Sequence, residues 1–180
     1  MRLLISLCVL FIILLSPIQV QARVTVADQI NEQQASYQTA VSRYSVANQQ
    51  KLKNLSEQIS QVNKNYTDQL ERTLTIQGQI LDEYQSREDD PKRIQNQLLY
   101  HTPRDQLSNG AVEKARYWLT FAQEAVAYQA AHQYIFNLRG ESAIKADGRS
   151  LVNQLKSDLK ILTQKALNAQ IMVKKVINEK

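Results

Sequence analysis

Apolar residues recur at helical spacing from Ala27 to Glu88, a stretch that holds one glycine and no proline. The steps between them are three or four residues and average about 3.6, the period of an α-helix. A single helix of this length would span about 90 Å at 1.5 Å per residue, so the rest of the chain must cover its apolar seam. The predicted seam runs through Ile30, Gln34, Tyr37, Val41, Tyr44, Asn48, Leu52, Leu55, Ile59, Val62, Tyr66, Leu70, Thr73, Gln77, Ile80 and Tyr84.

Four positions of this seam carry polar side chains: Gln34, Asn48, Thr73 and Gln77. Polar groups in a helical seam weaken packing, but they fix the register and the choice of partner. The alternative is that these side chains are partly exposed, because a rod only two helices thick leaves its seam in contact with water.

Helix-breaking signals divide the second half of the chain into three parts. A residue before proline is disfavoured in the α region, so Asp90 and Pro91 end the long helix. They open a connector of short helical pieces over residues 89–110. Residues 111–139 then predict a helix that is apolar on more than one face, and residues 150–178 predict a last helix.

These elements predict an all-α protein: an elongated antiparallel helical bundle or hairpin built on one very long N-terminal helix. If the two return helices lie end to end against the first, the molecule is a kinked hairpin. If the last helix folds back, a three-helix bundle forms and residues 27–50 project as a stalk. The broad apolar surface of residues 111–139 favours the bundle.

The helix over residues 111–139 supplies the candidate core. Trp118, Phe121 and Tyr128 are expected to anchor it against the long helix. The alternative is that one of its apolar faces is an exposed docking patch, which would then be the functional site. The candidate core or interface residues are Trp118, Leu119, Phe121, Val126, Tyr128 and Tyr134.

The first 22 residues predict a secretory signal peptide. A basic start at Arg2 precedes an apolar run from Leu3 to Leu15, a proline at Pro17, and Val20 and Ala22 at the positions that signal peptidase reads. Residues 23–180 then form a single helical domain, exported and periplasmic or extracellular. A membrane contact is expected only if the signal is not cleaved. Cys8, inside the signal, is the sole cysteine of the chain, so no disulfide is expected.

The charge distribution and the reactive residues argue against nucleic-acid binding, metal binding and catalysis. The net charge is +5, but the basic residues are scattered and lack the aromatic stacking partners of a nucleic-acid surface. His101 and His132 do not form a helical metal pair. The sequence shows no Ser-His-Asp order, Gly-rich phosphate loop or paired catalytic carboxylates. We therefore expect no catalytic residue, cofactor or metal, and a protein that is not an enzyme.

Short segments resemble exported helical families. The signal, the size and the long helices resemble the tentacle-like periplasmic chaperones, which also contain strands. Residues 119–123, Leu-Thr-Phe-Ala-Gln, are similar to the Leu-Thr-x-x-Gln box of small periplasmic stress chaperones. Asp90-Pro91 with Arg93 and Gln95 is similar to a segment of exported all-helical chorismate mutases. Each resemblance covers a small part of the chain.

The leading hypothesis is an exported, non-catalytic helical interaction or scaffold protein, such as a subunit or adaptor of a bacterial envelope or secretion assembly. Its partner would be another protein or a second copy of the chain, bound through helical packing. The alternative is a periplasmic holdase-type chaperone, and an all-helical exported enzyme is the third hypothesis.

Overall fold

The computed structural model describes residues 25–88 and 104–178, which form four α-helices, one short 3-10 helix and no strand. The helices are α2 (Val26–Val41), α3 (Val46–Glu88), α5 (Arg104–Ala131) and α6 (Ile144–Asn178), and the 3-10 helix η1 is Glu141–Ala143. The predicted all-α class is therefore confirmed. The predicted signal peptide and residues 89–103 of the predicted connector lie outside the described residues.

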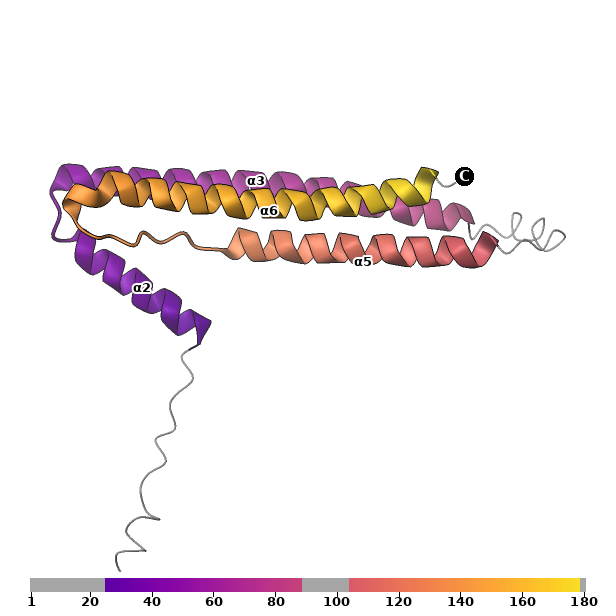
Figure 1. Ribbon diagram of the computed structural model, residues 1–180, viewed down its shortest axis with the longest axis horizontal. Coiled ribbons are helices and arrows are strands. Elements are labelled where there is room, and N and C mark those ends of the chain that lie inside the picture. The colour runs from indigo at the N-terminus through magenta and orange to yellow at the C-terminus, as the bar shows by residue number, and fades with distance from the viewer. Residues whose placement is uncertain (1–24, 89–103, 179–180) are drawn as a thin grey trace, which may run out of the picture.

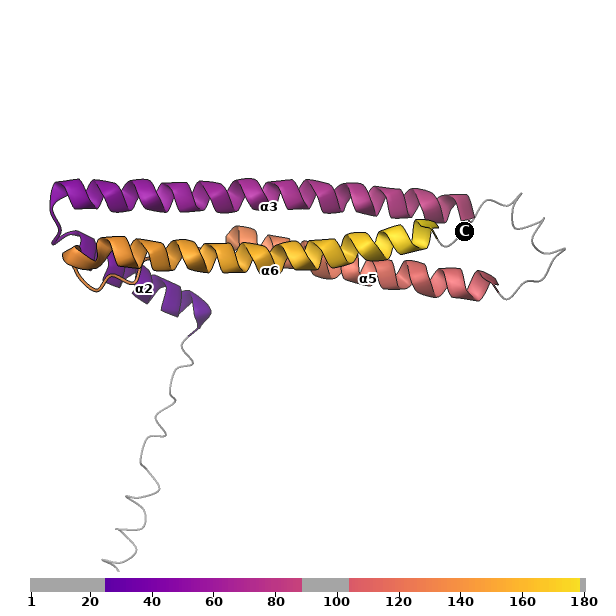
Figure 2. The same ribbon diagram turned by 45° about the horizontal axis from the view of Figure 1, so that its top comes forward.

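Three of the helices form a long bundle, with α5 antiparallel to α3 and α6 (Figures 1 and 2). Each of the three packs against the other two. The return helices therefore lie side by side, which is the three-helix arrangement and not the end-to-end hairpin.

Heptad-like spacing on α5 and α6 builds the core. Buried residues follow one another at steps of three and four on α5 and, apart from one seven-residue step between Leu155 and Leu162, on α6, which is the pattern of coiled-coil packing. Alanines at many of these positions let the helices approach closely. The buried residues of α5 are Val112, Ala115, Leu119, Ala122, Val126 and Gln129, and those of the α6 seam are Leu151, Leu155, Leu162, Ala166, Ala169, Val173 and Val176.

The buried face of α3 follows the predicted seam through Leu52 and Ile59 and is shifted by one residue from Asn63 onward. Val62 and Ile80, which the sequence pattern places in the seam, are 50% and 37% exposed. The buried residues are Leu52, Ile59, Asn63, Thr67, Leu74 and Leu81. Two of them are polar, and they can be buried because the protein supplies their hydrogen-bond partners.

The predicted single helix over residues 27–88 is wrong, because the chain breaks between α2 and α3. In a continuous helix the Ser45 N–H would bond to the carbonyl of Val41. Instead it donates to Glu141 Oε1 at 2.8 Å, while Ser45 Oγ donates to the same oxygen at 2.6 Å. A side chain 96 positions along the sequence therefore caps α3 and sets its first residue.

The predicted helix over residues 111–139 is also wrong at both ends. It begins within the predicted connector, at Arg104, and ends at Ala131, after which residues 132–140 run extended to the start of α6 (Figure 1). As a helix these nine residues would cover about 14 Å, but extended they cover about 30 Å. The extended form lets the chain reach the far end of the bundle, where α6 begins.

The α2 helix packs against this extended segment. The sequence pattern instead predicts that this part of the chain projects as a free stalk. The Tyr37 ring stacks on Phe136 with centroids 5.9 Å apart. Val41 and Tyr44 pack against the same cluster of buried residues. No residue of α2 is itself buried, so a few side chains near its C-terminal end hold the helix in place.

The α6 helix begins at Ile144, before the predicted position 150. Its first turn contains the buried Asp147, which accepts hydrogen bonds from the Arg139 backbone N–H at 3.0 Å and from Arg139 Nε at 2.7 Å. Burial opposes ionisation of Asp147, but the two hydrogen bonds and the charge of Arg139 hold its pKa below the ordinary value. This carboxylate therefore joins the extended segment to α6.

The backbone at Gly140 generates the first prediction. Its φ of 151° lies in a region that side chains other than glycine rarely adopt. We expect Gly140→Ala to lower the free energy of unfolding by about 1–3 kcal/mol. Gly110→Ala, inside α5 with open space around the new methyl group, should raise it by about 0.4–1 kcal/mol. Urea unfolding followed by circular dichroism measures both, and equal effects would contradict the prediction.

The Asp147 carboxylate should make the stability of the protein depend on pH in the acidic range. Because its folded pKa is lowered, its contribution to stability is present above the unfolded pKa and disappears as pH falls through the folded pKa. Asp147→Asn should therefore destabilise the protein at pH 7 and flatten the loss of stability below about pH 4. Melting temperatures from pH 7 to pH 2 test this. Asp82→Asn is the control, because its ion pair with Arg116 is exposed, and an equal change there would contradict the role of Asp147.

Candidate functional site

Three aromatic side chains on the outer face of α5 reach solvent. Tyr117 is 65% exposed, Phe121 37% and Tyr128 75%. The prediction that Phe121 and Tyr128 anchor the core is therefore wrong. The physical reason is that, among the described residues, α5 packs mainly against α3 and α6, and neither of them covers this sector of the helix.

These rings are ordered by their neighbours. Phe121 stacks on Tyr117 at 6.5 Å between centroids and meets Trp118 edge to face at 5.9 Å. Lys165 on α6 places its Nζ atom 4.7 Å from the Phe121 centroid, a cation–π contact between the two helices. Phe121 is thus held in one position while part of its face stays accessible.

Beside these rings, α5 and α6 line an open cavity of about 460 Å³. We call it the aromatic groove. Its walls are mainly apolar, with two acidic side chains and one basic side chain among them. The lining residues are Phe121, Glu124, Ala125, Tyr128, Gln129, Asp158, Ile161, Leu162 and Lys165. Of these Ile161 is 56% exposed and continues the apolar surface onto α6.

A chain of hydrogen bonds fixes one end of the aromatic groove. Tyr134 in the extended segment donates its hydroxyl proton to Asp158 Oδ2 at 2.8 Å and accepts from Gln129 Nε2 at 2.7 Å. Burial first, and then Asp158, raises the pKa of Tyr134 to about 12, although the bond from Gln129 acts the other way. The hydroxyl therefore stays protonated near neutral pH and keeps Asp158 in place.

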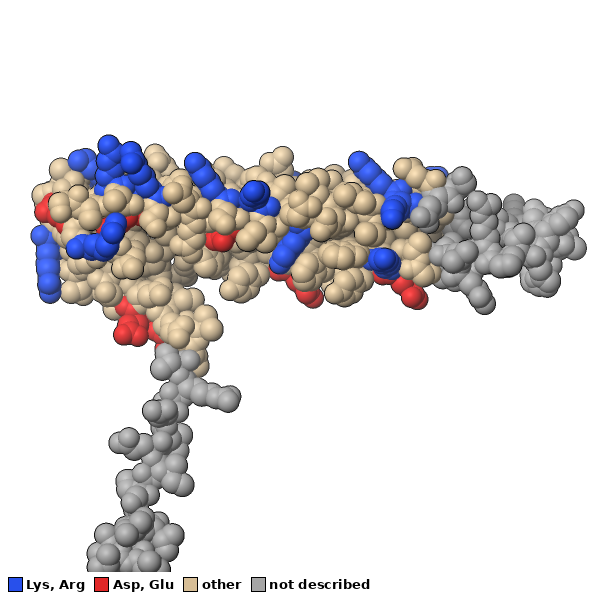
Figure 3. Space-filling view, viewed as in Figure 1, with Lys and Arg blue, Asp and Glu red and all other residues tan. Residues whose placement is uncertain are grey.

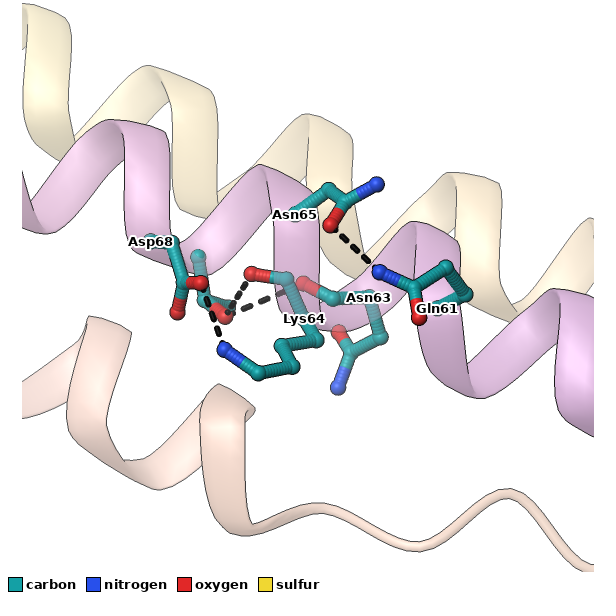
Figure 4. Close-up of polar contacts among 6 residues, drawn as sticks. Gln61, Asn63, Lys64, Asn65 and Asp68 are labelled. Atoms are coloured by element: carbon teal, nitrogen blue, oxygen red, sulfur yellow. Dashed lines mark hydrogen bonds and ion pairs between the residues drawn. The ribbon is translucent and has the colours of Figure 1, made fainter.

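The same chain of bonds continues into α3 through Asn63. Its amide donates to the Gln129 backbone carbonyl at 2.9 Å, and its Oδ1 accepts from Gln129 Nε2, also at 2.9 Å. Figure 4 shows the Asn63 side chain pointing toward the end of α5, while Gln61 and Asn65 pair with each other elsewhere on α3. Asn63 thus gives a second hydrogen bond to a carbonyl in the last turn of α5, which also accepts from the His132 backbone N–H at 3.1 Å.

The other predicted core residues lie mostly inside. Leu119, Val126 and Tyr134 are buried, and Trp118 is half-buried against the middle of the core.

The four predicted polar seam residues lie apart from the aromatic groove. Gln34 is exposed on α2, while Asn48, Thr73 and Gln77 are half-buried on α3. Asn48 donates to Glu141 Oε1 at 2.7 Å, and Thr73 bonds only to its own helix, to the Gln69 carbonyl.

Sequence reasoning missed the polar residues that matter most. Asn63 and Gln129 are buried and joined to each other, and neither was a candidate. A four-residue step from Ile59, in place of the three-residue step to Val62, would have placed Asn63 in the seam. Ile161 and Lys165 carried no signal of their own, because only the packing of α6 beside α5 brings them to Phe121.

Within residues 25–88 and 104–178, no group of three His, Cys, Asp or Glu side chains is placed to hold a metal ion. None of the described helices combines the length and apolar character needed to span a membrane. Comparison with known proteins finds no match: no family model, curated protein or solved structure is similar to this chain.

The contact between Asn63 and Gln129 predicts that Asn63 contributes more to stability than Val62. The sequence pattern, which places Val62 in the seam, predicts the opposite order. Asn63→Ala removes the acceptor of one N–H of the buried Gln129 amide, so it should lower the free energy of unfolding by about 1–3 kcal/mol. Val62→Ala, on the exposed side of the same turn, should change it by less than about 0.5 kcal/mol. Chemical denaturation measures both. A larger loss for Val62→Ala would show that the predicted seam was right.

Proposed function

We propose that this protein is an exported, non-catalytic helical interaction protein that binds a protein partner through the aromatic groove. The observation that carries the proposal is the accessible set of rings on α5, above all Tyr128, beside the exposed Ile161 of α6. Tyrosine and other aromatic residues dominate the energetic centres of protein interfaces. Contiguous exposed apolar surface is uncommon on a protein that functions alone.

The shape of the groove supports a helical occupant. Two long helices line it side by side, and an amphipathic helix can lay its apolar face into such a groove. Glu124 and Lys165 in its lining offer one charge of each sign to the polar face of the occupant, while Asp158 is bonded to Tyr134. The partner is another protein of the cell envelope, and the chain acts there as a subunit or adaptor of an envelope or secretion assembly.

A holdase-type chaperone is the second candidate. The groove that would take one helix would also take apolar segments of unfolded clients, and the basic α6 would favour acidic ones. The two candidates differ in selectivity. A chaperone suppresses the aggregation of an unfolded outer-membrane protein at equimolar ratio, whereas a subunit binds one folded partner and leaves that aggregation unchanged.

The test compares two exposed sites on the bundle. We expect a photo-crosslinker at Tyr128 to capture one partner in the envelope of the native cell, whereas the same group at the exposed Ile76 of α3 captures none. The double variant Phe121→Ala with Tyr128→Ala should weaken association with that purified partner by about thirtyfold or more. Its melting temperature should fall only modestly, because Tyr128 is 75% exposed, whereas Phe121 is 37% exposed and loses its contacts with Trp118 and Lys165.

Several outcomes would contradict the proposal. Equal capture from both sites would show that the aromatic groove is not the interface. A double variant that binds normally would show the same. A large drop in melting temperature, without loss of binding, would return Phe121 and Tyr128 to the core. Sedimentation of the wild type and the double variant distinguishes self-association from binding to another protein.

A further inference from the structure

The exposed surface of α6 is basic. The helix carries seven lysines and arginines and two aspartates. Both aspartates accept hydrogen bonds within the protein, Asp147 from Arg139 and Asp158 from Tyr134. Figure 3 shows the Lys and Arg side chains gathered most densely over the end of the bundle where α3 and α6 begin.

At this end, α3 and α6 enclose a second cavity, of about 740 Å³, which we call the basic groove. It differs from the aromatic groove because its walls are α3, η1 and α6, without α5. Apolar side chains from both helices form part of its lining: Leu52, Leu55, Ile144 and Val152. The buried Gly148 lets α6 approach Leu55 so closely that an added Cβ would lie 2.9 Å from Leu55 Cδ2.

Four cations also line the basic groove: Lys51, Lys145, Arg149 and Lys156. Within the described part of the chain, none of the four makes an ion pair; Lys51 Nζ only donates to Asn48 Oδ1 at 3.2 Å.

One acid lies in the lining, Glu141, and four cations against this one carboxylate leave a net charge of +3. Its Oε1 already accepts three hydrogen bonds, from the backbone and hydroxyl of Ser45 and the amide of Asn48. The positive charge of the groove is therefore not balanced within the described protein.

We propose that the basic groove binds a single-chain anionic lipid, with its acidic head at Lys145 and Arg149 and its acyl chain along Leu55 and Val152. Positive charge alone would attract any polyanion, and an apolar lining alone would take any hydrophobic molecule. The two together select an amphiphile with a negative head. The volume lies within the range of about 300–1,000 Å³ that is usual for sites holding one small molecule.

The experiment is calorimetric titration of the chain recovered after export, with three probes used below their micellar concentrations. Myristoyl lysophosphatidylglycerol carries both an anionic head and a chain, myristoyl lysophosphatidylcholine has the same chain with no net charge, and glycerol phosphate is a head alone. We expect one site for the first probe and at least tenfold weaker binding for the other two. Each methylene removed from the chain should weaken binding by up to about fourfold.

Variants locate the site. Lys145→Gln with Arg149→Gln should weaken binding of lysophosphatidylglycerol by about thirtyfold, from about fivefold for each cation. Lys174→Gln with Lys175→Gln removes the same charge from the other end of α6 and should change binding less than about twofold. All four side chains are exposed, so both pairs should melt like the wild type. If the apolar residues 3–15 are retained and bind lipid, they do so equally in all variants, so a difference between variants does not contain their contribution.

Four results would overturn the proposal. Equal weakening by the two variant pairs would show general attraction to a basic helix. Equal affinity for the uncharged lysolipid would show simple hydrophobic binding. Tight binding of polyglutamate or single-stranded DNA with the same dependence on Lys145 and Arg149 would assign the groove to a polyanion. Binding to phosphatidylglycerol vesicles without binding to the monomeric lysolipid would assign it to a bilayer surface. The aromatic groove and its partner are unaffected by any of these results.

Discussion

The structure depends on the place where α5 stops. No proline or glycine ends this helix; it ends where Asn63 of α3 bonds to the backbone and side chain of Gln129. From that joint the chain must still reach the start of α6 at the far end of the bundle. Extended backbone covers about twice the distance per residue that a helix covers, so residues 132–140 leave the helical form to complete the path.

This one change divides the bundle into two parts. Where α5 is present, small and aliphatic residues such as Ala115, Ala122 and Ala169 let three helices pack closely. Where the extended segment replaces it, larger side chains fill the space, with Tyr134 and Phe136 buried beside α3 and α6. The outward surface of Phe136 then gives Tyr37 of α2 a ring to stack on. The position of α2 is therefore a consequence of how α5 ends.

Both grooves lie along α6, because this helix packs against α5 on one side and against α3 on another. Toward α5 its exposed edge meets aromatic rings and forms the aromatic groove. Toward α3 its edge carries cations beside apolar side chains and forms the basic groove. The two aspartates of α6 bond within the protein, so they do not offset the basic surface. A single helix thus presents two surfaces of different chemistry.

Part of this could be read from the sequence. The all-helical class followed from periodicity, because spacing of three and four residues defines a helix whatever its partners are. The broad apolar surface of residues 111–139 favoured a three-helix bundle but left the end-to-end hairpin open. Leu119 and Val126 were expected in the core, and they are buried. Phe121 and Tyr128 were expected there too and are exposed, because hydrophobicity says that a ring prefers burial but not whether a neighbour is present to bury it.

The sequence by itself determined the helical class and the apolar periodicity of α6, since these depend only on local residue order. Its single cysteine also has no second cysteine in the chain to pair with. The tertiary structure decided the break between α2 and α3, the end of α5 and the shift of the α3 seam. Each of these rests on polar contacts between residues far apart in the chain: Ser45 with Glu141, and Asn63 with Gln129. A helix breaks or turns there because a distant group satisfies its backbone or its buried side chain, and no local pattern records that partner.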